Sequence, residues 1–240
     1  TVSYGQDWTN VLLKDDFNYA NGSGLIANGW SLHSGSTSPI LVGISNGLSY
    51  GGYLTNVASG NAAILTSAGE DVNKTFTSQT TGSVYASILV NVTNSSLAGD
   101  YFLHFGPNPI GTNFKGKLFV KKDALNKLAF GVSHSSNYDS NPTLPNFTLF
   151  NYDLNVTYLI VFKYEFVAGT TNDKASIIIN PDINATEPTI GWTSNIDTNT
   201  DPSNISSIAL RQGTANQNVN VLVDGLRVTN VWPFSISDAA

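Results

Sequence analysis

The stretch that decides the fold is the last apolar segment of the chain, Val219-Asn220-Val221-Leu222-Val223-Asp224-Gly225-Leu226-Arg227-Val228. Up to position 223 its valines alternate with other residues, which is typical of a strand with one buried face. At Asp224-Gly225 the alternation changes phase, and Leu226 and Val228 continue the apolar face. A change of phase at a glycine is typical of a β-bulge. The sequence therefore predicts a long, bent final strand with a carboxylate at its bend.

Similar short segments recur along the whole chain. They are rich in β-branched and aromatic residues and alternate with clusters of Gly, Asn, Pro and Ser, as in sandwiches and barrels. Besides the last strand, the expected strands are 11–17, 40–44, 62–66, 84–92, 101–105, 117–122, 127–132, 157–166, 174–179 and 205–211. No segment has a useful helical period, although 67–74 fits one helical turn. We expect an all-β protein, a two-sheet antiparallel β-sandwich.

The pattern predicts one domain over residues 11–234, followed by a C-terminal tail at 235–240. Sandwiches of this length commonly form one domain, and no linker or internal repeat divides the chain. Residues 1–10 precede the first strand that the core needs. We expect this segment to add as a strand to a neighbouring molecule, so that the protein would be its own partner and build a filament. The alternative is a disordered end, or pairing within its own sheet.

Composition narrows the class of partner. The apolar fraction of 41% supports a sizeable core, whereas charged residues make up only 12%, about half of the usual 25% or so. The net charge of −6 argues against nucleic acid or an anionic membrane as partner, and no stretch approaches the roughly 20 apolar residues of a membrane helix. The chain has no Cys and no Met, even at position 1. We interpret the chain as processed or as a fragment, and its low Lys content and its richness in Asn, Ser and Thr favour an extracellular or cell-surface protein.

Several motifs between about Leu12 and Trp232 resemble one known kind of module. They are Leu13-Lys14-Asp15-Asp16-Phe17, Asn28-Gly29-Trp30, Gly99-Asp100-Tyr101-Phe102-Leu103-His104, Ala209-Leu210-Arg211-Gln212-Gly213 and Val223-Asp224-Gly225-Leu226-Arg227-Val228. The chain is similar to the concanavalin A-like (laminin-G-like) jelly-roll module of secreted Bacteroidota-type surface proteins. The resemblance implies a jelly roll over nearly the whole chain. It implies no single function, because such jelly rolls serve as lectins, glycanases, adhesion domains and structural parts.

The resemblance also implies a structural Ca²⁺ between the terminal strands, with Asp16 and Asp224 as ligands. Calcium prefers six to eight oxygen ligands, and the terminal strands of a jelly roll lie side by side. The alternative is that these carboxylates pair with Lys14 or Arg227, or cap turns. A second candidate loop, 197–201, reads Asp-Thr-Asn-Thr-Asp but lacks the glycine and the glutamate of an EF-hand. Its alternative is a plain Asx-rich turn.

Aromatic residues in loops are the candidates for sugar binding. Tyr53 lies in a Gly-rich loop and Trp192 in a long polar loop. An aromatic ring beside amides suits the apolar face and the hydroxyl edge of a sugar. The alternative is that aromatic side chains fill the core, as we expect of Trp30 and Trp232. Tyr53 and Trp192 are the predicted ligand-binding residues.

Catalytic patterns are lacking. The three glutamates, Glu70, Glu165 and Glu187, form no carboxylate pair on one strand face of the kind that glycanases use. The histidines are scattered, and we interpret His104 as a half-buried structural residue of a strand. We expect a non-catalytic extracellular β-sandwich with a structural or adhesive role and the capacity to self-assemble. The alternatives are a carbohydrate-binding module that recognises surface glycans and, more distantly, a polysaccharide-degrading enzyme.

Overall fold

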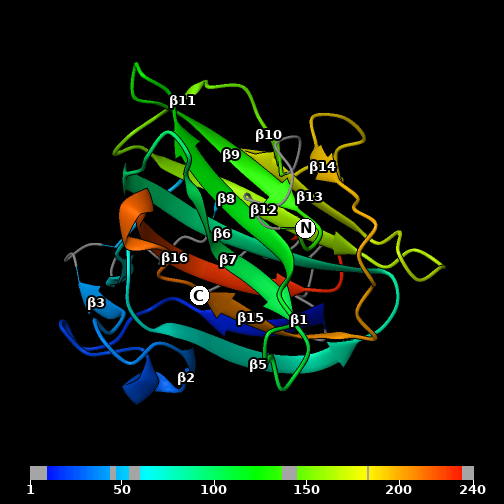
Figure 1. Cartoon of the computed structure of the whole chain (residues 1–240), viewed down its shortest axis with the longest axis horizontal. Coiled ribbons are helices and arrows are strands. Elements are labelled where there is room, and N and C mark those ends of the chain that lie inside the picture. The colour runs from blue at the N-terminus through cyan, green and yellow to red at the C-terminus, as the bar shows by residue number, and fades with distance from the viewer. Residues whose placement is uncertain (1–9, 44–46, 54–59, 137–144, 183, 234–240) are drawn as a thin grey trace, which may run out of the picture.

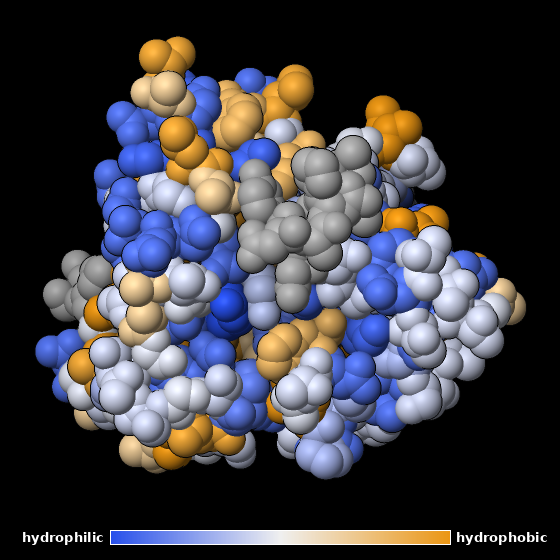
Figure 2. Space-filling model, in the orientation of Figure 1, coloured by the Kyte–Doolittle hydropathy of each residue, from blue (hydrophilic) through white to orange (hydrophobic). Residues whose placement is uncertain are grey.

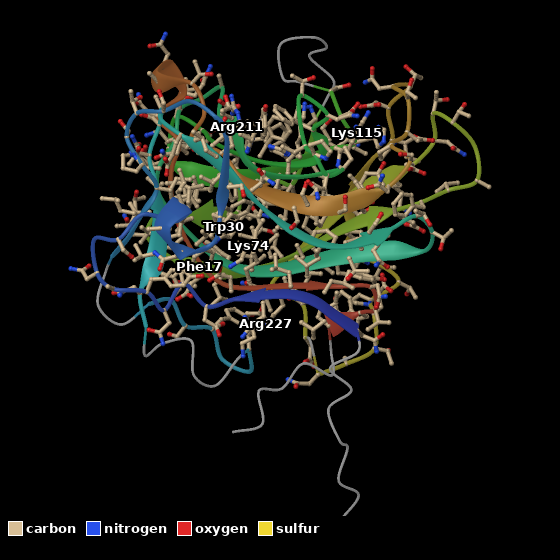
Figure 3. All side chains as sticks on the ribbon, turned by 90° about the horizontal axis from the view of Figure 1, so that it is seen from below. Phe17, Trp30, Lys74, Lys115, Arg211 and Arg227 are labelled. Carbon is tan, nitrogen blue, oxygen red and sulfur yellow. The ribbon has the colours of Figure 1, made fainter. Side chains whose placement is uncertain are left out.

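Two antiparallel sheets of eight strands make up the structure, a computed structural model that describes residues 10–43, 47–53, 60–136, 145–182 and 184–233 (Figure 1). Seen from below, the sheets form two stacked layers (Figure 3). This is the two-sheet β-sandwich that the sequence predicts. No helix among the described residues is long and apolar enough to cross a membrane.

Sheet A contains, in spatial order, β14 (Thr193–Asn195), β13 (Lys174–Ile179), β12 (Thr157–Glu165), β6 (Ser83–Asn94), β16 (Asn220–Thr229), β4 (Ala62–Leu65) and β3 (Leu41–Gly43), with β1 (Val11–Asp15) also beside β16. Sheet B contains β10 (Asn146–Phe147), β9 (Lys127–Ser133), β8 (Lys115–Lys122), β7 (Asp100–Gly106), β15 (Ile205–Leu210), β5 (Asp71–Gln79) and β2 (Ser31–Ser34), with β11 (Tyr152–Asp153) also beside β9. Short 3-10 helices span Ile26–Asn28 and Ala215–Gln217.

The final strand, β16, contains the predicted bulge. Its register against β6 shifts between Asp224 and Arg227, and Gly225 has a φ of 57°, a conformation that favours glycine. On its other edge, β16 pairs first with β4 and, beyond the bulge, with β1. The side chains on both sides of the bulge reach the core between the sheets: Val221, Val223, Leu226 and Val228. The bulge therefore keeps one apolar face inward while β16 changes its partner strand.

Two apolar clusters result from alternation along the strands of sheet A. Along β6 and β12, Ile88 and Ile160 face the core between the sheets, whereas Leu89 and Val161 belong to a second cluster on the outer face. Loop residues and Trp232 cover that second cluster. Trp30 and Trp232 are both buried, as expected. The outer face of sheet A is thus closed by apolar packing.

Two sequence-based expectations about secondary structure were incomplete. Residues 67–74, which by sequence fit one helical turn at most, contain no helix, because β5 begins at Asp71 and directs Val72 and Phe76 toward the core. The short strands β2 and β14 were not expected, since their polar residues resemble loop sequence. The segments 1–9 and 234–240 lie outside the described residues, and with them the predicted strand addition through residues 1–10.

Candidate functional site

The outer face of sheet B carries polar and aromatic side chains. Along β8, Leu118 and Val120 face the core, so Lys117, which precedes Leu118 in the alternation, points outward. The register places Lys117 beside His104 of β7, and His104 beside Ala209 of β15. The view of Figure 2 looks onto this face, where hydrophilic residues are widespread. This side of the sandwich therefore differs from the apolar cover of sheet A.

A hollow of about 570 Å³ lies on this face, over the beginning of β8 and the adjoining loops. Its lining combines two aromatic rings, two ammonium groups and several amides and hydroxyls, from Tyr101, Thr112, Asn113, Phe114, Lys115, Lys117, Ser135, Ser136, Asn199 and Thr200. No carboxylate is among these described lining residues. The hollow is thus a polar and partly aromatic site with positive charge at its floor.

Backbone carbonyls hold the two lysines at the floor of the hollow. Lys117 Nζ donates to the Ser135 carbonyl at 2.6 Å, and Lys115 Nζ donates to the Thr200 carbonyl at 2.6 Å. Burial lowers the pKa of Lys117 to about 8, and the nearby Arg211 guanidinium adds to this shift. Burial also lowers the pKa of Lys115, opposed by Asp197. Both ammonium groups are therefore held in place and partly stripped of water.

Two cations lie against the ring of Tyr101. The guanidinium carbon of Arg211 is 3.9 Å from the centre of the Tyr101 ring, and Lys117 Nζ is 5.0 Å from it. Such distances allow cation–π attraction. Arg211 is fixed by Asp100 Oδ1 at 2.9 Å and by the Tyr101 carbonyl at 3.0 Å. Figure 3 shows Lys115 and Arg211 in the layer of sheet B and Arg227 in the other layer.

Two histidines lie next to the aromatic wall of the hollow. The Phe114 ring is centred 4.3 Å from the ring of His104 and 5.8 Å from that of His33. Burial lowers the pKa of His33, and it lowers that of His104 to about 3, so both rings are neutral at pH 7. His104 is fully buried rather than half-buried, and its Nε2 has no hydrogen-bond partner among the described atoms.

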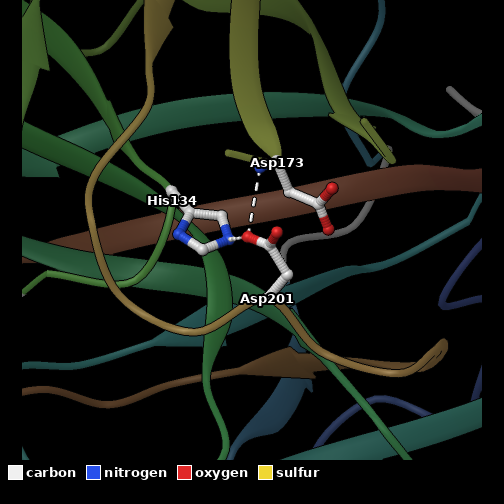
Figure 4. A group of neighbouring side chains, drawn as sticks. All are labelled: His134, Asp173 and Asp201. Atoms are coloured by element: carbon white, nitrogen blue, oxygen red, sulfur yellow. Dashed lines mark hydrogen bonds and ion pairs between the residues drawn. The ribbon is translucent and has the colours of Figure 1, made fainter. Parts of the chain in front are cut away.

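Behind Lys115, a buried network of His134, Asp173, Asp197 and Asp201 ties the flanking loops together. Figure 4 shows His134 with two of these aspartates, Asp173 and Asp201. His134 Nδ1 is 2.8 Å from Asp197 Oδ1, and His134 Nε2 is 3.5 Å from Asp201 Oδ1. Ligand atoms of His134, Asp173 and Asp201 lie within 4.8 Å of one another, which is compact enough for a metal ion. Their oxygens already accept protein hydrogen bonds, for example from the Asn172 and Val167 amides. The geometry is that of a structural network.

The predicted calcium loop 197–201 forms part of this network. Asp197 Oδ2 accepts hydrogen bonds from the backbone amides of Ser135 and Ser136, both at 2.9 Å. Its Oδ1 accepts another from the Asn199 amide at 2.9 Å. Burial alone would raise the pKa of Asp197, but the hydrogen bond with His134, followed by those from Asn199, Ser135 and Ser136, holds this pKa well below its usual range. The loop matches the Asx-rich turn of the alternative interpretation and positions two serines at the hollow.

The predicted calcium ligands, Asp16 just after β1 and Asp224 in β16, have protein partners on sheet A. Arg227 Nη1 is 2.6 Å from Asp16 Oδ1. Asp224 Oδ2 accepts from the Leu48 amide at 2.8 Å, and Oδ1 from the Gly225 amide at 2.7 Å. Burial raises the pKa of Asp224 to about 7, and Asp16 contributes to the shift. Both carboxylates thus make the contacts of the alternative interpretation, and Ca²⁺ binding by Asp16 and Asp224 stays a prediction.

The predicted aromatic platform of Tyr53 and Trp192 lies on the outer face of sheet A. Tyr53 is only 3% exposed, and its hydroxyl donates to the Gly225 carbonyl at 2.6 Å. Its ring is therefore buried, whereas a sugar-binding platform would expose it to solvent. Trp192 is half-buried against Trp232, with ring centres 6.0 Å apart, and its Nε1 donates to the Pro188 carbonyl. Both pack into the second apolar cluster, because this face needs an apolar cover.

The known proteins that are similar to this chain come from among the solved structures. No protein-family model matches the sequence, and no curated protein matches it. Among solved structures, an alginate lyase from Chlorella virus is similar over 92% of this chain and 99% of its own, with 11% identity and a TM-score of 0.49. Domain 4 of an extracellular arabinanase from Geobacillus stearothermophilus, solved with arabinotriose, is similar over 95% and 97%, with 13% identity and a TM-score of 0.49. The carbohydrate recognition domain of Emp47p is similar over 95% and 100%, with 11% identity and a TM-score of 0.47.

Proposed function

We propose that this chain is an extracellular carbohydrate-binding module and that the saccharide lies in the hollow on the outer face of sheet B. The observation that carries the proposal is the lining of that hollow, where Tyr101 and Phe114 stand among amides, hydroxyls and ammonium groups. Binding sites for polar ligands combine apolar surface with a few fixed polar groups. Sugars need both, because their ring faces are apolar and their edges carry hydroxyls.

The proposal assigns binding rather than glycoside hydrolysis to the hollow. Hydrolysis in most glycosidases requires two carboxyl groups on opposite sides of the scissile bond. The described lining residues include none. The nearest carboxylate network, around Asp197, is engaged in hydrogen bonds that hold Ser135 and Ser136. An adhesive role at a cell surface remains compatible with glycan binding, and a polysaccharide-degradation assay tests the enzymatic alternative.

A glycan array with the purified chain tests the proposal. We expect the wild type to bind a subset of glycans and Phe114→Ala to lose most of that binding, because the half-buried Phe114 ring lines the hollow. Ile190→Ala is the matched control, since Ile190 is 81% exposed and lies outside the hollow. Absence of binding across a broad panel, or equal loss in the control, would contradict the proposal.

A further inference from the structure

The hollow concentrates positive charge in an acidic protein. The chain has 11 Lys and Arg against 17 Asp and Glu, yet two ammonium groups line this one hollow, from Lys115 and Lys117. A net charge of −6 repels anions from the molecule as a whole. Attraction for an anion must therefore come from the two ammonium groups that line the hollow. The neighbouring carboxylates of Asp100 and Asp197 are already engaged, by Arg211 and by the backbone amides of Ser135 and Ser136.

Lys117 and Arg211 share the Tyr101 ring at 5.0 Å and 3.9 Å from its centre, so two like charges lie near one another. Burial and this repulsion both disfavour the protonated lysine, and the lowered pKa of Lys117 agrees with that. An anion placed against Lys117 would offset both the loss of water around the ammonium group and its repulsion by Arg211. The neutral rings of His33 and His104 leave the positive charge to the lysines and the arginine.

The lysines are also held in a geometry suited to a bound anion. Carbonyls of Ser135 and Thr200 fix both ammonium groups at 2.6 Å, which reduces the rotamer freedom lost when a ligand binds. An ammonium group has three N–H donors, and the Thr200 carbonyl uses one of those on Lys115. Hydrogen bonds from a charged donor to an anionic oxygen are about twice as strong as neutral ones.

We infer that the saccharide bound in the hollow is acidic, with a carboxylate or sulfate group held by Lys115 and Lys117 and with Arg211 supporting the site through its contact with the Tyr101 ring. This inference rests on the proposed carbohydrate binding. It adds the class of ligand, an anionic glycan, and the residues that select it.

Paired probes test the charge requirement. Binding is measured by titration calorimetry to polygalacturonate and its methyl ester, and to dextran sulfate and plain dextran. We expect at least one acidic probe to bind about tenfold or more tightly than its neutral counterpart, and that binding to weaken with salt, as expected of charge-assisted contacts. The two acidic probes distinguish a carboxylate from a sulfate.

Substitutions then test the residues. Lys117→Gln and Lys115→Gln should each weaken binding of the acidic probe about tenfold or more, because each removes a charged donor. Lys121→Gln is the matched control, since Lys121 lies on the same strand but outside the hollow lining. A thermal unfolding curve shows whether each variant is folded. If Lys117→Gln does not fold, the affinity of Lys115→Gln for the acidic probe tests the inference.

The possible outcomes separate the two claims. Equal binding of acidic and neutral probes, or equal loss in Lys121→Gln, overturns the inference and leaves carbohydrate binding standing. If neutral glycans of a broad array bind and the acidic probes do not, the inference fails alone. If no glycan of any kind binds, the proposed function fails as well.

Discussion

Replacing Asp224 by Asn tests how the burial of one carboxylate sets the pH dependence of stability. Burial raises the pKa of Asp224 from 3.8 to about 7, with the Leu48 and Gly225 amides opposing the shift and Asp16 adding to it. Between these two values the folded state keeps a proton that the unfolded state releases. The free energy of unfolding therefore falls as pH rises through this window. About 3 units at about 1.36 kcal/mol each give a loss of about 4 kcal/mol by pH 8.

Urea unfolding between pH 4 and pH 8 in EDTA measures this contribution. Over this pH range the free energy of unfolding should fall by about 4 kcal/mol more in wild type than in Asp224→Asn. Burial also raises the pKa of Asp71, to about 6, and the pH dependence that this causes is the same in both proteins. Leu125→Asn is the control, because Leu125 is 82% exposed and has no titratable group, so its replacement should leave the pH slope unchanged. Identical pH slopes in wild type and Asp224→Asn would refute the reasoning.

The same proteins test the calcium prediction. If Asp16 and Asp224 hold Ca²⁺, the cation should stabilise wild type at pH 8 by about 2.7 kcal/mol at a hundredfold excess over its dissociation constant. Asp224→Asn should show no such gain. A wild-type unfolding curve that is the same in EDTA and in Ca²⁺ rules out a stabilising, exchangeable site.

Three further predictions concern packing and assembly. Gly116→Ala should cost about 1–3 kcal/mol in urea unfolding, because Gly116 has a φ of 58° and a Cβ would lie 2.9 Å from the Phe162 ring; an unchanged midpoint would contradict this. Arg227→Met should cost roughly 3 kcal/mol by leaving Asp16 without its buried partner, and adding Asp16→Asn should restore part of the loss. Deleting residues 1–10 should leave a folded monomer if that segment joins neighbouring molecules. Light scattering that shows only monomers of the full-length protein would contradict this prediction.

Alternation of apolar residues made most of the fold predictable. The bulge at Asp224-Gly225 was visible because an apolar face that must stay inward needs an extra residue where the phase changes. Strand β5 was missed because its outward positions are polar and its start, Gly-Glu-Asp, resembles a helix N-terminus more than a strand. Short edge strands such as β14 were missed for a related reason: they depend on a partner strand, which the local sequence does not show.

The candidate site was harder to predict, because it joins loops that are far apart in the chain. Lys117 and Lys121 alternate with Leu118 and Val120, so their outward direction could be predicted from the sequence. What could not be predicted is that Asn199 and Ser135 lie over the same end of β8, since the buried network around Asp197 brings them there. Loop aromatics such as Tyr53 were misleading because loops that cover a sheet face bury their rings as strands do.

Mapping a bound glycan on the protein tests the central claim most directly. In amide NMR spectra recorded while a glycan selected from the array is added, the hollow on sheet B should respond. The largest shifts are expected at Tyr101, Phe114, Lys117, Ser135 and Asn199, which line it. Saturating shifts confined to these elements would confirm the account. Shifts confined to the loop around Trp192, on the outer face of sheet A, would contradict it.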